Sequence, residues 1–162
     1  MESQISISRT CDLSYEAIAE LLKHDPSQAL RAPAADAADN AAPAVVHLHT
    51  GWSRFDHDEP VRAQIGHYET VRTGHGRVNL SWEADHHKRL LPYVNGHLEV
   101  DQVSAAVSEL RYVGHYRPPL GILGRLEDTA IGHRVVEDAI GQLLDETITH
   151  LRQHHASGTD QS

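Results

Sequence analysis

The sequence predicts an α+β fold in which an antiparallel β-sheet packs against one long C-terminal helix. Apolar residues recur at steps of three and four along Gly121 to Arg152, which is the period of one helix face. The chain before Gly121 instead alternates apolar and polar residues over short stretches, as β-strands do. Strand and helix patterns do not alternate along the chain, so the sequence does not indicate a parallel nucleotide-binding sheet.

The C-terminal helix would be about 45 Å long at a rise of about 1.5 Å per residue, and a helix of that length needs a broad surface to cover it. Glycines at 124, 132 and 141 interrupt it and indicate a kink or the close approach of neighbouring backbone. The predicted buried face consists of Ile122, Leu126, Ala130, His133, Val136, Ile140, Leu144, Ile148 and Leu151.

Six strands and two short helices are expected before this helix. The short helices are predicted over Tyr15 to His24, capped by Asp12 or Ser14, and over Ser27 to Arg31. A hairpin turn is predicted at residues 73–76, because its two glycines accept positive φ. The strands are predicted at Ile5 to Cys11, Val45 to Trp52, Val61 to Thr73, Arg77 to Asp85, Pro92 to Val103 and Val107 to Tyr116.

Composition limits the class of protein. The chain has 162 residues, which suits one domain, predicted over residues 1–153 with a disordered polar tail at 154–162. A net charge of −9 without any basic run disfavours nucleic acid and anionic membranes as partners. The single cysteine, Cys11, cannot form an internal disulfide and is expected to be a buried apolar residue. Without a signal-peptide pattern or a spanning apolar run, we expect a cytoplasmic protein with no membrane insertion, as a monomer or weak homodimer.

Several segments resemble the START-like superfamily (SRPBCC; polyketide cyclase/dehydrase and lipid transport). They are Arg117-Pro118-Pro119-Leu120-Gly121 leading into Gly124-Arg125-Leu126 and His133-Arg134-Val135, and the strand that ends Asn95-Gly96-His97-Leu98-Glu99-Val100. The resemblance extends from Ile5 to Arg152 and implies a helix-grip fold. In that fold a curved antiparallel β-sheet wraps around the long C-terminal α-helix, with two short N-terminal helices and a cavity for an apolar ligand between sheet and helix. It carries no shared catalytic signature, so the fold alone does not decide the function.

His133 and Glu137 are the main polar exceptions on the predicted buried face. They lie one helical turn apart, about 40° apart on an ideal wheel. A buried carboxylate must be paired or hydrogen-bonded. One interpretation is a structural pair that fixes the helix to the sheet, with Arg134 as a third member. The other is a polar pair in a ligand cavity that orients a ligand or moves a proton.

The aromatic residues Trp82, Tyr112 and Tyr116 are assigned to the inward faces of their strands. They are interpreted either as core packing or as the lining of a pocket for a flat or apolar ligand. The predicted ligand-binding residues are Trp82, Tyr112, Tyr116, His133, Glu137 and Ile140.

Histidine is abundant, with 14 residues, but its pairs show no third ligand at metal-site spacing. The pairs are His47 with His49, His86 with His87, and His154 with His155. The sequence therefore predicts no metal site and no other cofactor.

Three functions remain open at this point. The leading hypothesis is the binding of a small apolar or aromatic molecule in the cavity between sheet and helix. The second is a cyclase-, dehydratase- or hydrolase-like enzyme acting on a polyketide-like or aromatic substrate, with His133 and Glu137 as acid and base. The third is a protein–protein interaction module with a collapsed cavity.

Overall fold

A computed structural model describes residues 2–30, 61–84, 93–117 and 129–159. Residues 26–30 are helical in addition to the elements named below. The predicted strand from Val45 to Trp52 and the predicted first turns of the long helix, residues 121–128, lie outside the described residues. The elements in chain order are β1 (Ser3–Cys11), α1 (Tyr15–His24), β2 (Val61–Arg72), β3 (His75–Ala84), β4 (Tyr93–Gln102), β5 (Ser108–Arg117) and α3 (Thr129–Thr159).

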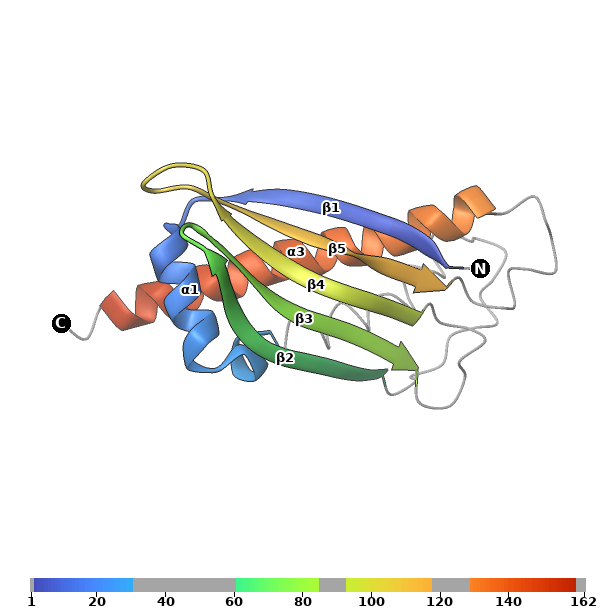
Figure 1. Ribbon diagram of the computed structural model, residues 1–162, viewed down its shortest axis with the longest axis horizontal. Helices are drawn as coiled ribbons and strands as arrows, with labels where there is room; N and C mark the ends of the chain where they lie inside the picture. Colours follow the sequence, from blue (N-terminus) through green and yellow to red (C-terminus); the bar gives the residue numbers. More distant parts are fainter. Residues whose placement is uncertain (1, 31–60, 85–92, 118–128, 160–162) are drawn as a thin grey trace.

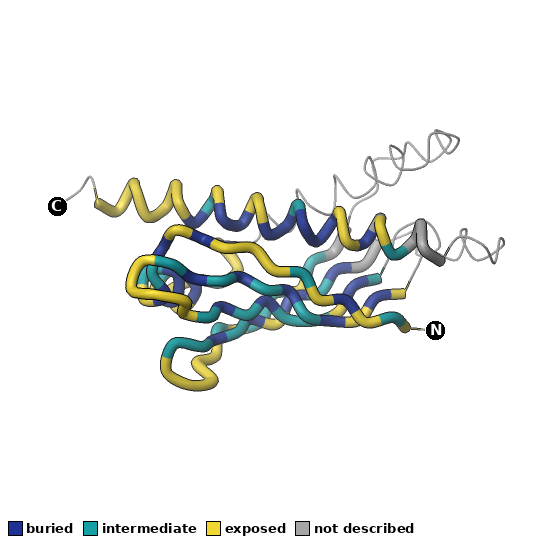
Figure 2. Tube along the Cα trace, turned by 90° about the horizontal axis from the view of Figure 1, so that it is seen from above, coloured by how far each residue is buried: buried dark blue, intermediate teal, exposed yellow. Residues whose placement is uncertain are grey.

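The five described strands form one antiparallel sheet in the order β1-β5-β4-β3-β2. The sheet is curved, and α3 runs along the whole of one face while α1 lies at one end (Figure 1). Seen from above, α3 turns buried residues toward the sheet and exposed residues away from it (Figure 2). This is the α+β helix-grip arrangement that the sequence predicts, and that prediction is confirmed.

Strand register places two rows of large side chains on the inner face of the sheet. Trp82, Val94 and Tyr116 are paired across β3, β4 and β5 in one row, and Val78, Leu98 and Tyr112 form another. Between them the register aligns Gly96 with Gly114. The two inner rows are therefore separated by a position that carries no side chain on β4 or β5.

The described part of α3 buries the apolar stripe that its sequence predicts, including Ile140, Leu144 and Leu151. At Gly141 a Cβ atom would lie only 2.7 Å from Nη2 of Arg9, a residue of β1. The absence of a side chain at Gly141 therefore leaves room for the Arg9 side chain to cross the surface of α3. Arg9 then pairs with Asp145 at 3.2 Å between Nε and Oδ1. The predicted close approach at this glycine is thus made by a side chain rather than by a neighbouring backbone.

The helix also extends further than expected, to Thr159 rather than Arg152. Residues 154–159 are helical, although the sequence assigns them to a disordered tail. Polar composition suggested a tail, but no proline breaks this segment, and an exposed final stretch of helix can be polar on all sides.

The sequence also predicts α1, and its bounds of Tyr15 to His24 are confirmed. Ser14 is the N-cap, since its side chain accepts a hydrogen bond from the backbone nitrogen of Ala17 at 3.2 Å. Asp12, the alternative cap, instead accepts a hydrogen bond from Arg152 of α3 at 2.6 Å, which lowers the pKa of its carboxyl group. Cys11 is buried as expected, and burial raises the pKa of its thiol.

Candidate functional site

A chain of three hydrogen-bonded side chains crosses from β5 to α3. Tyr116 lies on the inner face of β5, with its Oη atom 2.7 Å from Nδ1 of His133. Nε2 of His133 lies 3.1 Å from Oε1 of Glu137, one helical turn further along α3. The tyrosine and histidine rings are tilted against each other with centroids 5.7 Å apart. The chain therefore links a buried phenol, through an imidazole, to a carboxylate.

Exposure rises along this chain from Tyr116 to Glu137. Tyr116 is 3% exposed, whereas the side chains of His133 and Glu137 are 42% and 46% exposed. Burial raises the pKa of the Tyr116 phenol; the Glu137 carboxylate adds to this, and a hydrogen bond with Ser3 acts against it. The phenol is therefore protonated at neutral pH. With a neutral imidazole, Tyr116 donates to Nδ1 and Nε2–H donates to Glu137.

The placement of His133 and Glu137 corrects the expectation that both are buried. The buried stripe of α3 begins at Val136 in the described residues, and Glu137 points to the solvent side of it. His133 and Glu137 do pair with each other, as the helical wheel predicts, but the buried apolar face of α3 is narrower than the wheel suggests. The third member of the group is Tyr116 from the sheet, whereas the sequence suggests Arg134, which is exposed.

The other predicted site residues, Trp82, Tyr112 and Ile140, lie in the hydrophobic core between the sheet and α3. Tyr112 and Ile140 have no solvent-accessible surface, so no water-sized space lies against them. The rings of Trp82 and Tyr112 are 6.0 Å apart, on strands that flank Gly96. The hydroxyl of Tyr112 donates to the backbone oxygen of Leu80 at 2.7 Å, so it is already used inside the protein.

Removing this hydroxyl tests whether it serves the fold or a ligand. We expect Tyr112→Phe to lower the free energy of unfolding by about 1–2 kcal/mol, because the buried Leu80 carbonyl loses its partner. We expect the variant to bind the aromatic probes described below as the unmodified protein does. Urea denaturation and a fluorescence titration measure the two effects. A loss of probe affinity without a loss of stability would instead assign this hydroxyl to the ligand.

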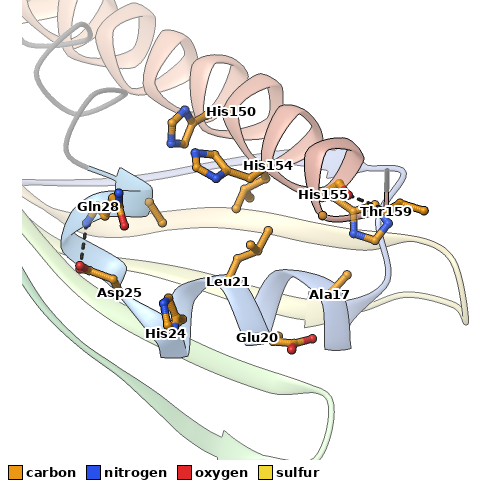
Figure 3. Close-up of a pocket in the computed structure, with 13 residues that line it drawn as sticks. Ala17, Glu20, Leu21, His24, Asp25, Gln28, His150, His154, His155 and Thr159 are labelled. Carbon is orange, nitrogen blue, oxygen red and sulfur yellow. Dashed lines mark hydrogen bonds between the residues drawn. The ribbon is translucent and has the colours of Figure 1, made fainter. Parts of the chain in front are cut away.

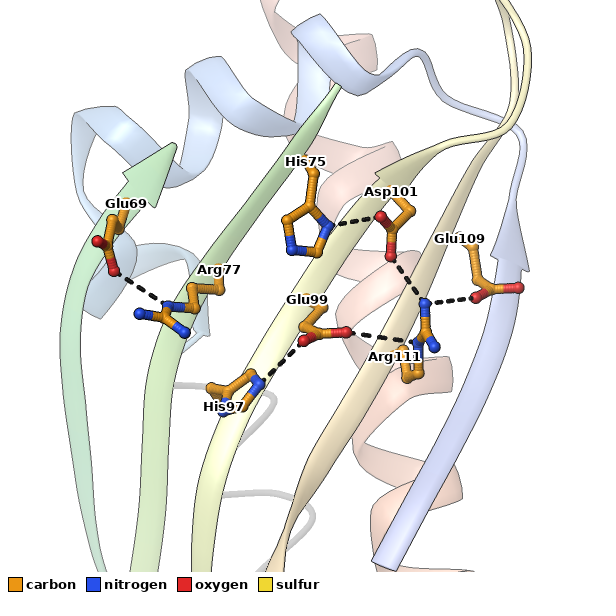
Figure 4. Close-up of polar contacts among 8 residues, drawn as sticks. All are labelled: Glu69, His75, Arg77, His97, Glu99, Asp101, Glu109 and Arg111. Atoms are coloured by element: carbon orange, nitrogen blue, oxygen red, sulfur yellow. Dashed lines mark hydrogen bonds and ion pairs between the residues drawn. The ribbon is translucent and has the colours of Figure 1, made fainter. Parts of the chain in front are cut away.

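The sheet face opposite α3 carries a second polar group, which the sequence analysis did not find (Figure 4). Arg111 of β5 pairs with Asp101 at 3.0 Å and with Glu99 at 3.5 Å, both on β4. His75 lies 2.5 Å from Asp101, and His97 lies 3.0 Å from Glu99. The hydrogen bond to Asp101 raises the pKa of Arg111. This network joins β3, β4 and β5 on a face where ion pairs are partly exposed. We therefore infer that it helps to fix the pairing register of these strands and is not a binding or catalytic site.

No protein-family model matches the chain, and no curated protein matches it. Among solved structures, the Zhui aromatase/cyclase from Streptomyces sp. R1128 is 10% identical, with 94% of this chain and 95% of that chain covered and a TM-score of 0.44. The protein TTHA0849 from Thermus thermophilus is 10% identical over 94% and 99% of the two chains, with a TM-score of 0.45. Ara h 8.0201 is 10% identical over 97% and 99%, with a TM-score of 0.42.

At these scores the matches say nothing about ligand or activity, and the fold rests on the chain's own elements. A curved antiparallel sheet, a long C-terminal helix across it and short N-terminal helices together form the helix-grip architecture of START-like proteins. The helix-grip fold that the START-like resemblance implies is therefore confirmed. Within the described residues, no helix is both long enough and apolar enough to cross a membrane.

Proposed function

We propose that the protein binds a small hydrophobic or aromatic molecule between the sheet and α3, with Tyr116 and His133 at the polar end of the ligand. The observation that carries this proposal is the series of hydrogen bonds from Tyr116 through His133 to Glu137. It places an imidazole that solvent can reach beside an otherwise apolar interior. Ligand sites are commonly apolar with a few placed polar groups of this kind.

Burial of Trp82, Tyr112 and Ile140 limits how such a ligand enters. These residues are closely packed in the core, so a ligand at the His133 end reaches them only if their side chains repack. Tyr116 and Trp82 belong to the same inner row of the sheet, with Val94 between them, so a ligand that extends along this row from Tyr116 would reach Trp82 after Val94.

A pair of probes that differ in one hydroxyl group tests the proposal. We expect 2-naphthol to bind about tenfold more tightly than naphthalene, because its hydroxyl can hydrogen-bond with the Tyr116–His133 pair. Tryptophan fluorescence titration measures both affinities. In His133→Ala the preference for 2-naphthol should fall to within about twofold, while the affinity for naphthalene stays the same.

Glu137→Gln is the matched control for this measurement, since it keeps the shape of the side chain and a hydrogen-bond acceptor for His133. We expect it to retain most of the preference for 2-naphthol. If neither compound binds, the binding proposal fails, and a protein–protein interaction module with a collapsed interior becomes the better interpretation.

The same three hydrogen-bonded residues, Tyr116, His133 and Glu137, favour an acid/base enzyme as the second candidate function. A buried phenol connected through an imidazole to an exposed carboxylate can pass a proton between the interior and solvent. His133 and Glu137 would act as acid and base on a ligand carbonyl. Exchange of the α-protons of 2-tetralone in D2O, followed by NMR, tests this. An enzyme should accelerate the exchange above buffer and lose that rate in Glu137→Gln while 2-tetralone still binds.

A further inference from the structure

The sheet face opposite α3 has a hollow beside the ion-pair network. Its volume is about 610 Å³, and β2, β3, β4 and β5 all contribute to its lining. Short side chains form its floor, whereas the longer side chains of Arg77, Glu99 and Arg111 lie in the next row of the sheet (Figure 4). On β2, a Cβ atom at Gly66 would lie 3.2 Å from Cβ of Asn79. The glycine therefore helps to keep the floor open.

Strand register aligns uncharged polar side chains in this hollow. Ser81 of β3 is paired with Asn95 of β4, and Asn95 is paired with His115 of β5. At the two ends of this row, Gln64 of β2 is paired with Ser81 and Gln4 of β1 with His115. Side chains paired across antiparallel strands face the same side of the sheet, with Cβ atoms about 4.5–5.5 Å apart. We call these five residues the polar row, and each described strand contributes one of them.

The polar row keeps hydrogen-bonding groups that the fold does not use. Within the described residues, no side chain of the row takes part in a hydrogen bond or an ion pair with the protein. The next row differs, since Arg77 pairs with Glu69 at 3.0 Å and Arg111 pairs with Glu99 at 3.5 Å. Amides and hydroxyls both donate and accept, and so does a neutral imidazole. The row therefore suits ligand groups that also donate and accept.

The hollow is also uncharged when its two histidines, His97 and His115, are neutral. Among the described residues that line it, none is lysine, arginine, aspartate or glutamate. The cavity of about 460 Å³ between α1 and the last turns of α3 is different, because the carboxylates of Glu20 and Asp25 and four histidines line it (Figure 3). A charged ligand in the outer hollow would find no free counter-ion, since the neighbouring charges already pair with one another. A neutral polar ligand needs none.

We propose that this hollow binds a neutral sugar. Each hydroxyl group of a sugar donates and accepts, as the amides of the polar row do, and the C–H face of a sugar ring can pack against Val113 on the same side of the sheet. From β2 to β5 the hollow extends over about 14 Å, at about 4.8 Å per strand, which favours an oligosaccharide over a single hexose. The site lies on the other face of the sheet from Tyr116 and does not depend on the function proposed above.

NMR titration of the isotopically labelled full chain with maltotriose, cellotriose and mannotriose tests the proposal. The side-chain amides of asparagine and glutamine give signals of their own, so binding is observed at the groups that make it. We expect at least one sugar to cause saturable shifts at Gln64, Asn79 and Asn95. The signals of Ala17 and Leu21, which line the cavity between α1 and α3, should not move. If no sugar shifts the three amides, or if the shifts concentrate at Ala17 and Leu21, the proposed site is wrong.

Substitution of Asn95 tests whether the polar row makes the contacts. Asn95→Leu removes a hydrogen-bonding group and keeps a side chain of similar size, and Asn95 is exposed, so no core packing is lost. We expect the affinity for the sugar to fall about fivefold or more. Asn79→Leu, at a second exposed position of the hollow, should have a similar effect.

Gln153→Leu is the matched control, because it removes an exposed amide from α3 instead. We expect its affinity for the sugar to stay within about twofold of the unmodified protein. Unchanged affinity in both Asn95→Leu and Asn79→Leu would overturn the proposal. An equal loss in Gln153→Leu would do so too, because the contacts would then not be specific to the hollow.

Discussion

Gly96→Ala should lower the free energy of unfolding by about 3 kcal/mol or more, the largest effect that we expect from a single added methyl group. A Cβ atom at Gly96 would lie 2.2 Å from the backbone oxygen of Val113 and 2.6 Å from Cα of Gly114. Both contacts are with the backbone of β5, which cannot move aside as a flexible side chain can. The strands would have to separate at the centre of the sheet, beneath the Trp82–Tyr112 contact.

Urea denaturation measures this effect, and Gly158→Ala supplies the control. Gly158 lies near the end of α3, and nothing is within 4 Å of the position that its Cβ would occupy. Alanine favours helix over glycine, so this variant should be as stable as the unmodified protein or more stable by about 0.5 kcal/mol. If Gly96→Ala unfolds at the same urea concentration as Gly158→Ala, the close approach of β4 and β5 at this point is wrong.

Ile140→Ala should cost about 2–5 kcal/mol of unfolding free energy, which is typical for deleting a fully buried aliphatic side chain. Ile140 has no solvent-accessible surface and lies on the sheet-facing stripe of α3 between Val136 and Leu144. The deletion leaves a cavity that tightly packed neighbours fill only in part. A cost below about 1 kcal/mol would show instead that the space beside Ile140 is already open.

Val103→Ala is the comparison for this measurement. Val103 follows β4 and is 61% exposed, so its truncation removes little packing and should change stability by less than about 0.5 kcal/mol. The same denaturation series can be repeated with 2-naphthol present. If the bound ring contacts Ile140 after repacking, the affinity for the probe should change in Ile140→Ala and remain constant in Val103→Ala.

The fold could be predicted from the sequence because its signals are local. Period-two alternation and helical periodicity each extend over a whole element, and caps and glycine turns mark the ends. The bounds of α1 are correct as predicted, and Gly74 adopts the positive φ of 72° that its hairpin requires. The end of α3 was missed because residues 154–159 have no apolar face, which is the pattern from which the helix was predicted.

The site could be predicted only in part, because its contacts depend on how elements are placed relative to one another. Spacing alone pairs His133 with Glu137, but it does not reveal that Tyr116 lies against His133, since that depends on how far α3 slides along β5. A helical wheel shows the direction in which each side chain leaves the helix axis, but it does not show where along the helix the covering sheet ends.

The pairing of β1 with β5 has a consequence for how the protein is made. Ser3 is opposite Tyr116 in the sheet, so β1 finds its partner strand only after roughly 100 more residues are synthesised. At an elongation rate of about 5–20 residues per second, that delay is about 5–20 s. During it, Ile5 and Ile7 have no partner strand beside them, so β1 is open to aggregation until β5 has been made.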